Sequence, residues 1–148
     1  NHFKSKGYGG QDASNRKRWL QAESTRRIVD RLAAETASLV AVVGDLNDTP
    51  DSAALAPLVK ESGFKDISEH PAFDSGGRPG TFGRCSEREK IDYILLSPAL
   101  FARVKSGGVW RKGVWGPNKK PLWEVYPEMK QSFHAASDHA CLWCDLDV

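Results

Sequence analysis

Four short segments of this sequence place carboxylate, carboxamide or imidazole groups next to apolar, strand-like runs. In chain order they cover residues 1–5, 44–48, 91–96 and 137–139. Hydrolysis of a phosphodiester needs a charge-neutralising metal, a positioned water, a base for that water and donors to the phosphoryl oxygens. Oxygen ligands suit a hard divalent cation such as Mg²⁺, and imidazoles exchange protons near neutral pH. The four segments together contain every group type that this chemistry requires.

The segment 44–48 offers two polar side chains at the exit of an apolar run. With strand alternation, Asp45 and Asn47 point the same way and can share one water or one phosphate. The alternative is a simple turn, because Gly, Asp and Asn are common turn formers, and Asp48 with Pro50 would begin the next helix. Because the other three segments occur in the same chain, we favour the interpretation as a functional site.

Asp92 is a single acid inside the apolar run 91–96. A carboxylate in such a strand is costly unless it is paired, although an acid at a strand start facing solvent is the simpler interpretation. A paired carboxylate can fix the tautomer of a histidine, as in hydrolytic triads. His139 is the candidate partner, in a tripeptide that on its own would indicate only a polar loop.

A long helix and a buried strand are expected to position the first two segments. Residues 14–36 contain no Gly or Pro, and Trp19, Ala22, Val29 and Leu32 recur at helical spacing. The apolar run 39–43 has no polar alternation, which is typical of a strand covered on both faces. With residues 2–4 as the end of a preceding strand, the pattern predicts a βαβ-like crossover with active groups at the carboxyl ends of the strands.

The rest of the chain is predicted to form shorter elements. We expect a helix over residues 53–61, a Gly- and Pro-rich loop over 74–80, and a hairpin whose strands are residues 81–83 and 91–96. A short helix follows from residue 97, and residues 140–146 form a final strand. Periodicity fails between residues 105 and 137.

The aromatic and basic stretch 105–133 has two interpretations. Its aromatics, interleaved with lysines and arginines, are Trp110, Trp115, Trp123, Tyr126 and Phe133. Stacking aromatics near lysines suit single-stranded or distorted nucleic acid. Large aromatics also anchor long loops to a domain, and we place this second interpretation somewhat ahead. A basic patch does not choose between DNA, RNA, a phosphoinositide and a phospholipid head group.

Composition limits the possibilities further. A chain of 148 residues is one domain or less, and a net charge of +2 is too small to argue for nucleic acid by itself. No apolar run is long enough to span a membrane. The three cysteines cannot form a complete disulfide framework, and Cys141 with Cys144 has only the spacing of half a zinc knuckle. Structural thiols are therefore favoured over a zinc site.

The ordered segments resemble the C-terminal half of the endonuclease/exonuclease/phosphatase superfamily, the metal-dependent phosphodiesterases of the deoxyribonuclease type. The resemblance covers residues 1 to about 146. It implies an α/β layered sandwich, with residues 1–148 as one C-terminal portion contributing a mixed sheet flanked by helices. It also implies Mg²⁺ or Mn²⁺ as cofactor and a nucleic acid or another phosphodiester as substrate. Residues 1–5 and 44–50 are most similar to a bacterial branch of extracellular nucleases, and a secreted parent protein would fit.

The resemblance also implies roles for individual residues. His139 would act on the attacking water, and Asp92 would orient it. Asp138 would contribute to the metal site together with Asp45. Asp45 and Asn47 would position the water and a phosphoryl oxygen.

Two further residues of the first segment receive roles in the same way. His2 would contact the phosphate on the leaving-group side, and Lys4 would support the phosphate electrostatically. A solvated lysine at a strand end explains Lys4 about as well.

Members of that superfamily carry a further half before the Asn-His segment, including the principal metal-binding glutamate. We therefore expect weak metal binding and little hydrolysis from this chain alone, with the longer parent as the enzyme. Exposed strand edges would then invite pairing with the missing half or formation of a homodimer. The alternatives are a non-catalytic binding module that kept the fold, and a phosphatase or phosphodiesterase acting on a lipid or small-molecule phosphate.

Overall fold

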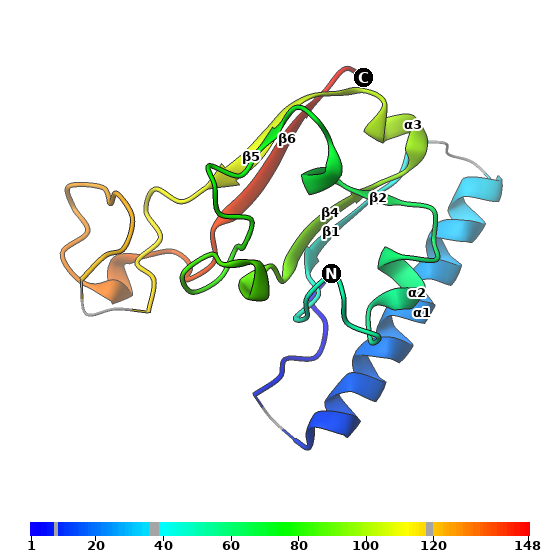
Figure 1. Ribbon diagram of the computed structural model, residues 1–148, viewed down its shortest axis with the longest axis horizontal. Coiled ribbons are helices and arrows are strands. Elements are labelled where there is room, and N and C mark those ends of the chain that lie inside the picture. Colours follow the sequence, from blue (N-terminus) through cyan, green and yellow to red (C-terminus); the bar gives the residue numbers. More distant parts are fainter. Residues whose placement is uncertain (8, 36–38, 118–119) are drawn as a thin grey trace.

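Two three-stranded sheets pack against each other, and the long helix α1 (Gln11–Glu35) covers the other face of the first sheet (Figure 1). The computed structural model describes residues 1–7, 9–35, 39–117 and 120–148. The first sheet has the order β1 (Ala41–Asp45), β4 (Asp92–Leu96), β2 (Lys65–Asp66). The second has the order β3 (Phe73–Asp74), β5 (Val104–Trp110), β6 (Cys141–Leu146). The predicted α/β class is confirmed, with the strands divided between two sheets.

The remaining elements are short. The α-helices α2 (Ala56–Val59) and α3 (Pro98–Phe101) each make about one turn, and the 3₁₀ helices are η1 (Ile67–Glu69), η2 (Glu87–Glu89) and η3 (Ser132–His134). No helix within the described ranges is long and apolar enough to cross a membrane.

Helix α1 confirms the predicted helix, although residue 36 lies outside the described residues. Its buried side differs from the prediction. Trp19 and Leu32, expected on the inner face, are 44% and 39% exposed, whereas Ala22 and the arginine Arg18 are completely buried. A small side chain lets the helix lie close to the sheet, and burial of Arg18 is possible because the guanidinium finds acceptors there.

The predicted crossover brings residues 2–3 beside the end of β1. His2 forms a parallel bridge with Asp45, and the Phe3 N–H donates a 2.9 Å hydrogen bond to the Asp45 carbonyl. The prediction that the strand after α1 is covered on both faces is wrong for the described chain. Val42 packs into the core with 4% exposure, but its neighbour Val43 is 51% exposed.

The predicted hairpin is wrong. Strand β4 pairs antiparallel with β1 and with β2, and Phe82 instead forms a bridge with His139. The chain turns at Gly83 and Cys85, whose φ angles are 59° and 56°, so residues 81–83 cannot continue as a strand. The tight turn frees the whole of β4 to pair in the centre of the first sheet.

The structure also differs from the prediction for residues 53–61 and for residues 105–137. The helix expected over residues 53–61 is regular only in α2, because residues 49–55 form turns. Part of the stretch without periodicity is the seven-residue strand β5. Its Gly107 and Gly108 interrupt the sequence pattern, and Gly108 leaves room for the side chain of Trp143 in β6. The described residues from 111 to 137 are otherwise irregular apart from η3.

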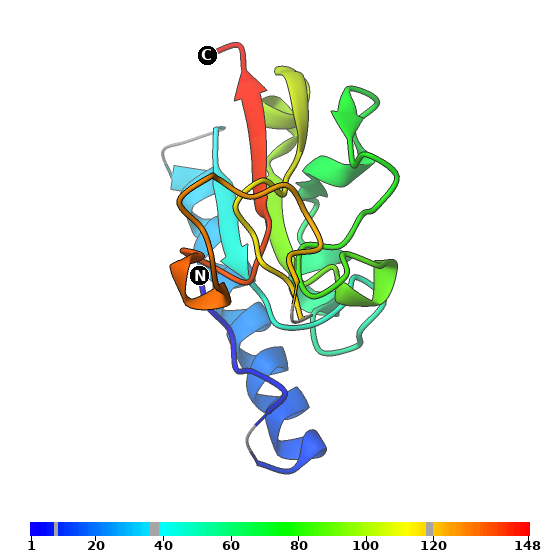
Figure 2. The ribbon, with the colours of Figure 1, turned by 90° about the vertical axis from the view of Figure 1, so that its left-hand side faces the viewer.

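The core has three parts. One lies between α1 and the first sheet and includes Ala22, Val29, Val42 and Tyr93. A second joins the two sheets through Leu96 of β4 and Val104 of β5, with the inner side chains of β6 packed against it. A small third cluster contains Cys85, Val114 and Ala140. The order of layers is therefore helix, first sheet, second sheet, as the rotated view shows (Figure 2).

Candidate active site

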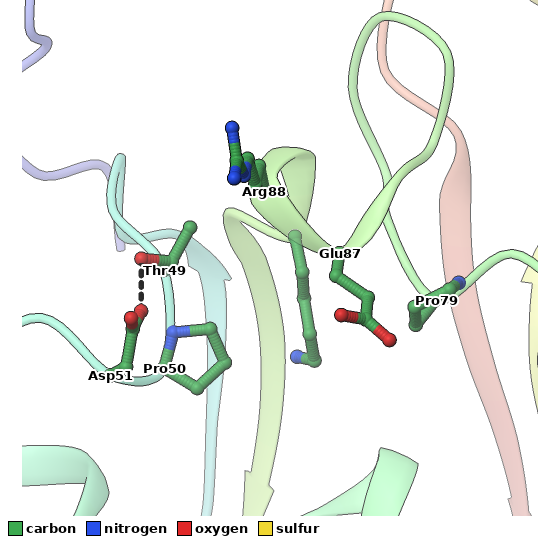
Figure 3. A pocket seen from close by; sticks show the side chains of 7 residues that line it. Thr49, Pro50, Asp51, Pro79, Glu87 and Arg88 are labelled. Carbon is green, nitrogen blue, oxygen red and sulfur yellow. Dashed lines mark hydrogen bonds between the residues drawn. The ribbon is translucent and has the colours of Figure 1, made fainter.

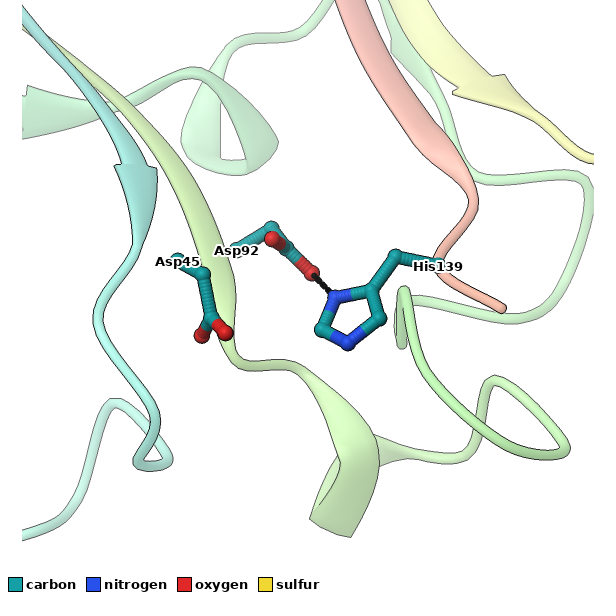
Figure 4. Close-up of side chains that lie close together, drawn as sticks. All are labelled: Asp45, Asp92 and His139. Atoms are coloured by element: carbon teal, nitrogen blue, oxygen red, sulfur yellow. Dashed lines mark hydrogen bonds and ion pairs between the residues drawn. The ribbon is translucent and has the colours of Figure 1, made fainter. Parts of the chain in front are cut away.

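Three titratable side chains meet where strands of the two sheets come together: Asp45, Asp92 and His139 (Figure 4). Asp45 ends β1 and Asp92 begins β4, and the antiparallel register places them directly opposite each other. His139 lies two residues before β6. One ligand atom from each of the three residues lies within 4.8 Å of the other two.

Asp92 and His139 form a hydrogen-bonded pair. The His139 Nδ1 and the Asp92 Oδ2 are 2.9 Å apart, and both side chains are largely enclosed. This hydrogen bond raises the pKa of His139 above its usual value, burial opposes the shift, and the negative charges of Asp92 and Asp45 reinforce it. A carboxylate at Nδ1 favours the proton on that nitrogen, which leaves Nε2 as the atom that can accept another proton.

The ionised form of Asp45 is disfavoured, whereas that of His139 is favoured. Burial raises the pKa of its carboxyl, a hydrogen bond from the Asn47 backbone opposes the shift, and the nearby charge of Asp92 raises it further. Two carboxylates at one sheet end repel each other when both are ionised. A divalent cation between them would relieve this repulsion, and their oxygens are the ligands that Mg²⁺ and Mn²⁺ prefer. The three residues could therefore hold a divalent metal ion.

Asn47 forms the predicted turn and also contacts the carboxylate of Asp45. Its backbone adopts a left-handed conformation, with φ of 56°, and its N–H donates to Asp45 Oδ1 at 2.7 Å, as in a turn. Its side-chain Nδ2 also donates to Asp45 Oδ2 at 2.8 Å and to the Phe3 carbonyl at 3.1 Å. Asn47 thus fixes the carboxylate of Asp45 and joins it to the first segment.

The other predicted site residues lie at the margin of this cluster. The His2 Nε2 is 3.7 Å from Asp45 Oδ2, with a side chain that is 76% exposed. The Lys4 Nζ donates to the Ser5 carbonyl at 2.9 Å. Asp138 is exposed beside His139, and it is not among the side chains whose ligand atoms gather within 4.8 Å.

Two residues that the sequence did not single out position the pair. Thr81 is fully buried, and its Oγ1 accepts from the N–H groups of Asp92 at 3.2 Å and Ile91 at 3.4 Å. Its carbonyl accepts from the Ala140 N–H at 2.6 Å, next to His139. The Phe82 ring lies 4.9 Å from the His139 ring, centre to centre. Thr81 therefore connects the backbones that carry both partners, a role that no local sequence signal reveals.

Asp48 anchors the loop that follows Asp45 and Asn47. Its carboxylate receives hydrogen bonds from buried Arg18 at 3.1 Å and from Ser52 at 2.9 Å, and the Lys6 Nζ lies 2.6 Å away. The Tyr93 hydroxyl, next to Asp92, donates to the Asp48 carbonyl at 2.8 Å. The predicted role of Asp48 as a helix cap is therefore wrong: it ties the loop to α1 and to β4.

A pocket of about 520 Å³ lies between Thr49, Pro50 and Asp51 on one side and Pro79 and Glu87 on the other (Figure 3). It also includes Lys90, but that ammonium is held 2.6 Å from Asp66. None of its lining residues belongs to the cluster of Asp45, Asp92 and His139.

The cysteines do not form a second metal centre in the part of the chain that the structure describes. Cys141 is exposed and Cys144 is half-buried, three positions apart on β6. Side chains alternate along a strand, so the two thiols leave from opposite faces. Among the described residues, the group of potential ligands is the one formed by Asp45, Asp92 and His139.

Comparison with known proteins identifies the family and the fold. A model of the Endonuclease/Exonuclease/phosphatase family matches residues 1–75. The fold is similar to an endonuclease/exonuclease/phosphatase family protein from Bacteroides thetaiotaomicron, with TM-score 0.53 and 21% identity over 64% of this chain and 34% of that chain. It is also similar to beta toxin 275-280 from Staphylococcus aureus, with TM-score 0.61 and 17% identity over 99% of this chain and 51% of that chain.

At these identities the two structures show a shared fold. This chain spans about a third of the first and half of the second. A search among curated proteins gave no match.

Proposed function

The chain belongs to the endonuclease/exonuclease/phosphatase family, and we propose that it supplies the proton-transfer side of a metal-dependent phosphodiesterase, in the simplest case a nuclease. Family membership indicates phosphodiester hydrolysis in general. The observation that carries the proposal is the Asp92–His139 pair at 2.9 Å, beside the carboxylate of Asp45. A binding module that only kept the fold has no need of an oriented imidazole next to two acids.

In the proposed reaction, His139 is the general base. With its Nδ1 proton held by Asp92, the Nε2 atom takes a proton from a water molecule as that water attacks phosphorus. The phosphorus–oxygen bond on the opposite side breaks, and the leaving oxygen takes up a proton from solvent or from exposed His2. Asn47 fixes the carboxylate of Asp45, so the polar wall of the site stays in place during the reaction.

We propose Mg²⁺ or Mn²⁺ as the cofactor, held by Asp45 with Asp138 as a further ligand after a movement of its exposed side chain. When bound, the ion neutralises charge on the phosphate and on the two carboxylates. Burial and the neighbouring charge of Asp92 raise the pKa of Asp45, which supports this part because a bound cation would stabilise the ionised carboxylate. Lys4 would add a more distant positive charge toward the substrate phosphate.

We also propose that residues 1–148 act as the C-terminal portion of a longer domain. The support is the share of the two similar structures that this chain spans, 34% and 51% of their lengths. A second support is the 51% exposed Val43, on the face of β1 that turns away from α1. Further metal ligands would come from the other portion, and homodimerisation through strand edges is the competing arrangement. We propose secretion of the parent protein only because residues 1–5 and 44–50 resemble extracellular nucleases.

The test is metal-dependent cleavage of plasmid DNA and of bis-p-nitrophenyl phosphate, with and without Mg²⁺ or Mn²⁺. It compares this chain, a longer protein that contains it, and the His139→Ala variant of each. We expect the longer protein to lose about 10²- to 10⁴-fold in rate on substitution. The matched control is His70→Ala, a histidine that packs on Phe101 away from the cluster and should leave the rate unchanged.

The outcomes separate the alternatives. Hydrolysis of small phosphodiesters or lipid phosphates without cleavage of DNA or RNA would keep the phosphodiesterase and reject the nuclease. Full activity of this chain alone would reject the split metal site. A folded but inert longer protein would reject catalysis and support the binding-module alternative.

A further inference from the structure

A cavity of about 320 Å³ opens directly beside His139. It lies between the end of β5 and the described residues of the range 111–137, which we call the 111–137 segment. Its lining includes Trp110, Lys112, Val114, Tyr126, Met129 and His139 itself. A group attached to a phosphate at His139 would therefore meet this cavity first.

The tryptophans and tyrosine at the end of β5 and in the 111–137 segment divide into two classes. Trp115 is 7% exposed and belongs to the interior. Trp123 is stacked near the guanidinium groups of Arg78 and Arg111, 5.5 Å and 5.4 Å from its ring centre. These two tryptophans anchor the segment, as the simpler sequence interpretation predicted.

Trp110 and Tyr126 form the second class. They are 54% and 45% exposed, and both line the cavity. Exposed aromatic faces are costly to hydrate and are enriched where ligands bind. Both share this cavity with His139.

The charge at the cavity limits what it can hold. The Lys112 ammonium lies 5.3 Å from the centre of the Tyr126 ring and 2.6 Å from Glu124. This cation already occupies the position over the ring where a quaternary ammonium head group would be attracted. With Val114 and Met129 as apolar walls, the cavity fits a flat, uncharged aromatic group better than a second cation.

We propose that the cavity binds an unpaired nucleobase of the strand whose phosphate reaches His139, so that single-stranded or locally unpaired nucleic acid is the substrate. A base in a duplex is stacked and paired, and it would have to leave the helix to enter. This inference rests on the proposed function, which placed the phosphate at His139.

The experiment measures binding in EDTA, so that hydrolysis plays no part. The probes are a short end-labelled oligothymidylate and a strand of equal length that lacks all bases. We expect the strand with bases to bind about tenfold tighter or better, in line with the energy of stacking a base on an aromatic side chain. Trp110→Ala and Tyr126→Ala should bring the oligothymidylate down to the affinity of the base-free strand and leave the latter unchanged.

The matched control is Trp19→Ala on α1, a tryptophan with 44% exposure that lies outside the cavity lining. It should alter neither affinity, and thermal unfolding of all variants checks that they fold.

Equal affinity for the two strands, or no binding of either, would overturn the inference, as would wild-type discrimination in both cavity variants. Binding to phosphocholine vesicles that depends on Trp110 would also overturn it and assign the cavity to a lipid. None of these outcomes depends on hydrolysis, and loss of hydrolysis in His139→Ala says nothing about base discrimination. The two proposals therefore fail separately.

Discussion

The loop around Asp48 and the 111–137 segment both border the site, but they are held in contrasting ways. The Asp48 loop is fixed by a buried ion pair with Arg18, by Lys6 and Ser52, and by the Tyr93 hydroxyl. The described residues of the 111–137 segment form a single regular element, η3, and buried Trp115 and half-buried Trp123 pack toward the interior. The first region can keep Asp45 and Asp92 in a fixed relation, whereas the second presents exposed aromatics that can adapt to a ligand.

The largest effect is expected from breaking the Asp48 anchor. Asp48→Ala leaves the fully buried Arg18 guanidinium with the Lys4 carbonyl and the Asn15 side chain as its acceptors among the described residues. We expect a loss of about 3 kcal/mol in the free energy of unfolding. Urea denaturation measures it. Asp51→Ala, an exposed neighbour bonded to Thr49, is the control and should change little. A loss as small as that of the control would show that Arg18 is satisfied without Asp48.

The next effect concerns the connection between the two regions. Thr81→Val removes the acceptor of the Asp92 and Ile91 N–H groups, so the Asp92–His139 pair should loosen. In the active longer protein we expect about a 10- to 100-fold loss in kcat/KM, as for other groups that orient active-site ligands. Thr81→Ser keeps the hydroxyl and should retain most of the rate. If the serine variant loses as much as the valine variant, the methyl group and not the hydroxyl is responsible.

A smaller effect is expected in the dependence of stability on pH. Burial by itself would raise the pKa of Asp48, but hydrogen bonds from Lys6 and Ser52 outweigh it and hold that pKa below its ordinary value of 3.8. A carboxyl with a lowered pKa contributes stability above its unfolded pKa, and the contribution is lost as the pH falls through the folded value. Wild-type stability should thus fall more steeply below about pH 4 than that of Asp48→Asn. Parallel curves from acid titrations followed by circular dichroism would contradict this.

The smallest effect on the free energy of unfolding is expected from a substitution in the 111–137 segment. Phe133 in the 111–137 segment is 73% exposed, and its ring packs only edge-on against His134 among the described aromatic contacts. Phe133→Ala should change the free energy of unfolding by less than about 0.5 kcal/mol. Thermal unfolding checks it. A loss of several times that size would mean that the segment is as firmly packed as the Asp48 loop.

The site was predictable from the sequence to the extent that its residues lie at strand ends. The apolar run before Asp45 and the apolar run after Asp92 indicated where two carboxylates would emerge, and both lie at one end of the first sheet. Helix α1 was predictable because 25 residues without a helix breaker leave few alternatives. The buried side of that helix was not, since local periodicity does not reveal that Arg18 would find Asp48, thirty positions later.

The sequence by itself determined the residue types for phosphoryl chemistry, their order, and the long helix. Only the tertiary structure decided that β4 pairs with β1 and not with residues 81–83, and that Thr81 joins the segments of Asp92 and His139. It also decided that Trp110 and Tyr126 stay exposed while Trp115 is buried. The reason is physical. Propensity and spacing act over a few residues, whereas strand register and the choice of which aromatic to bury depend on partners far apart in the chain.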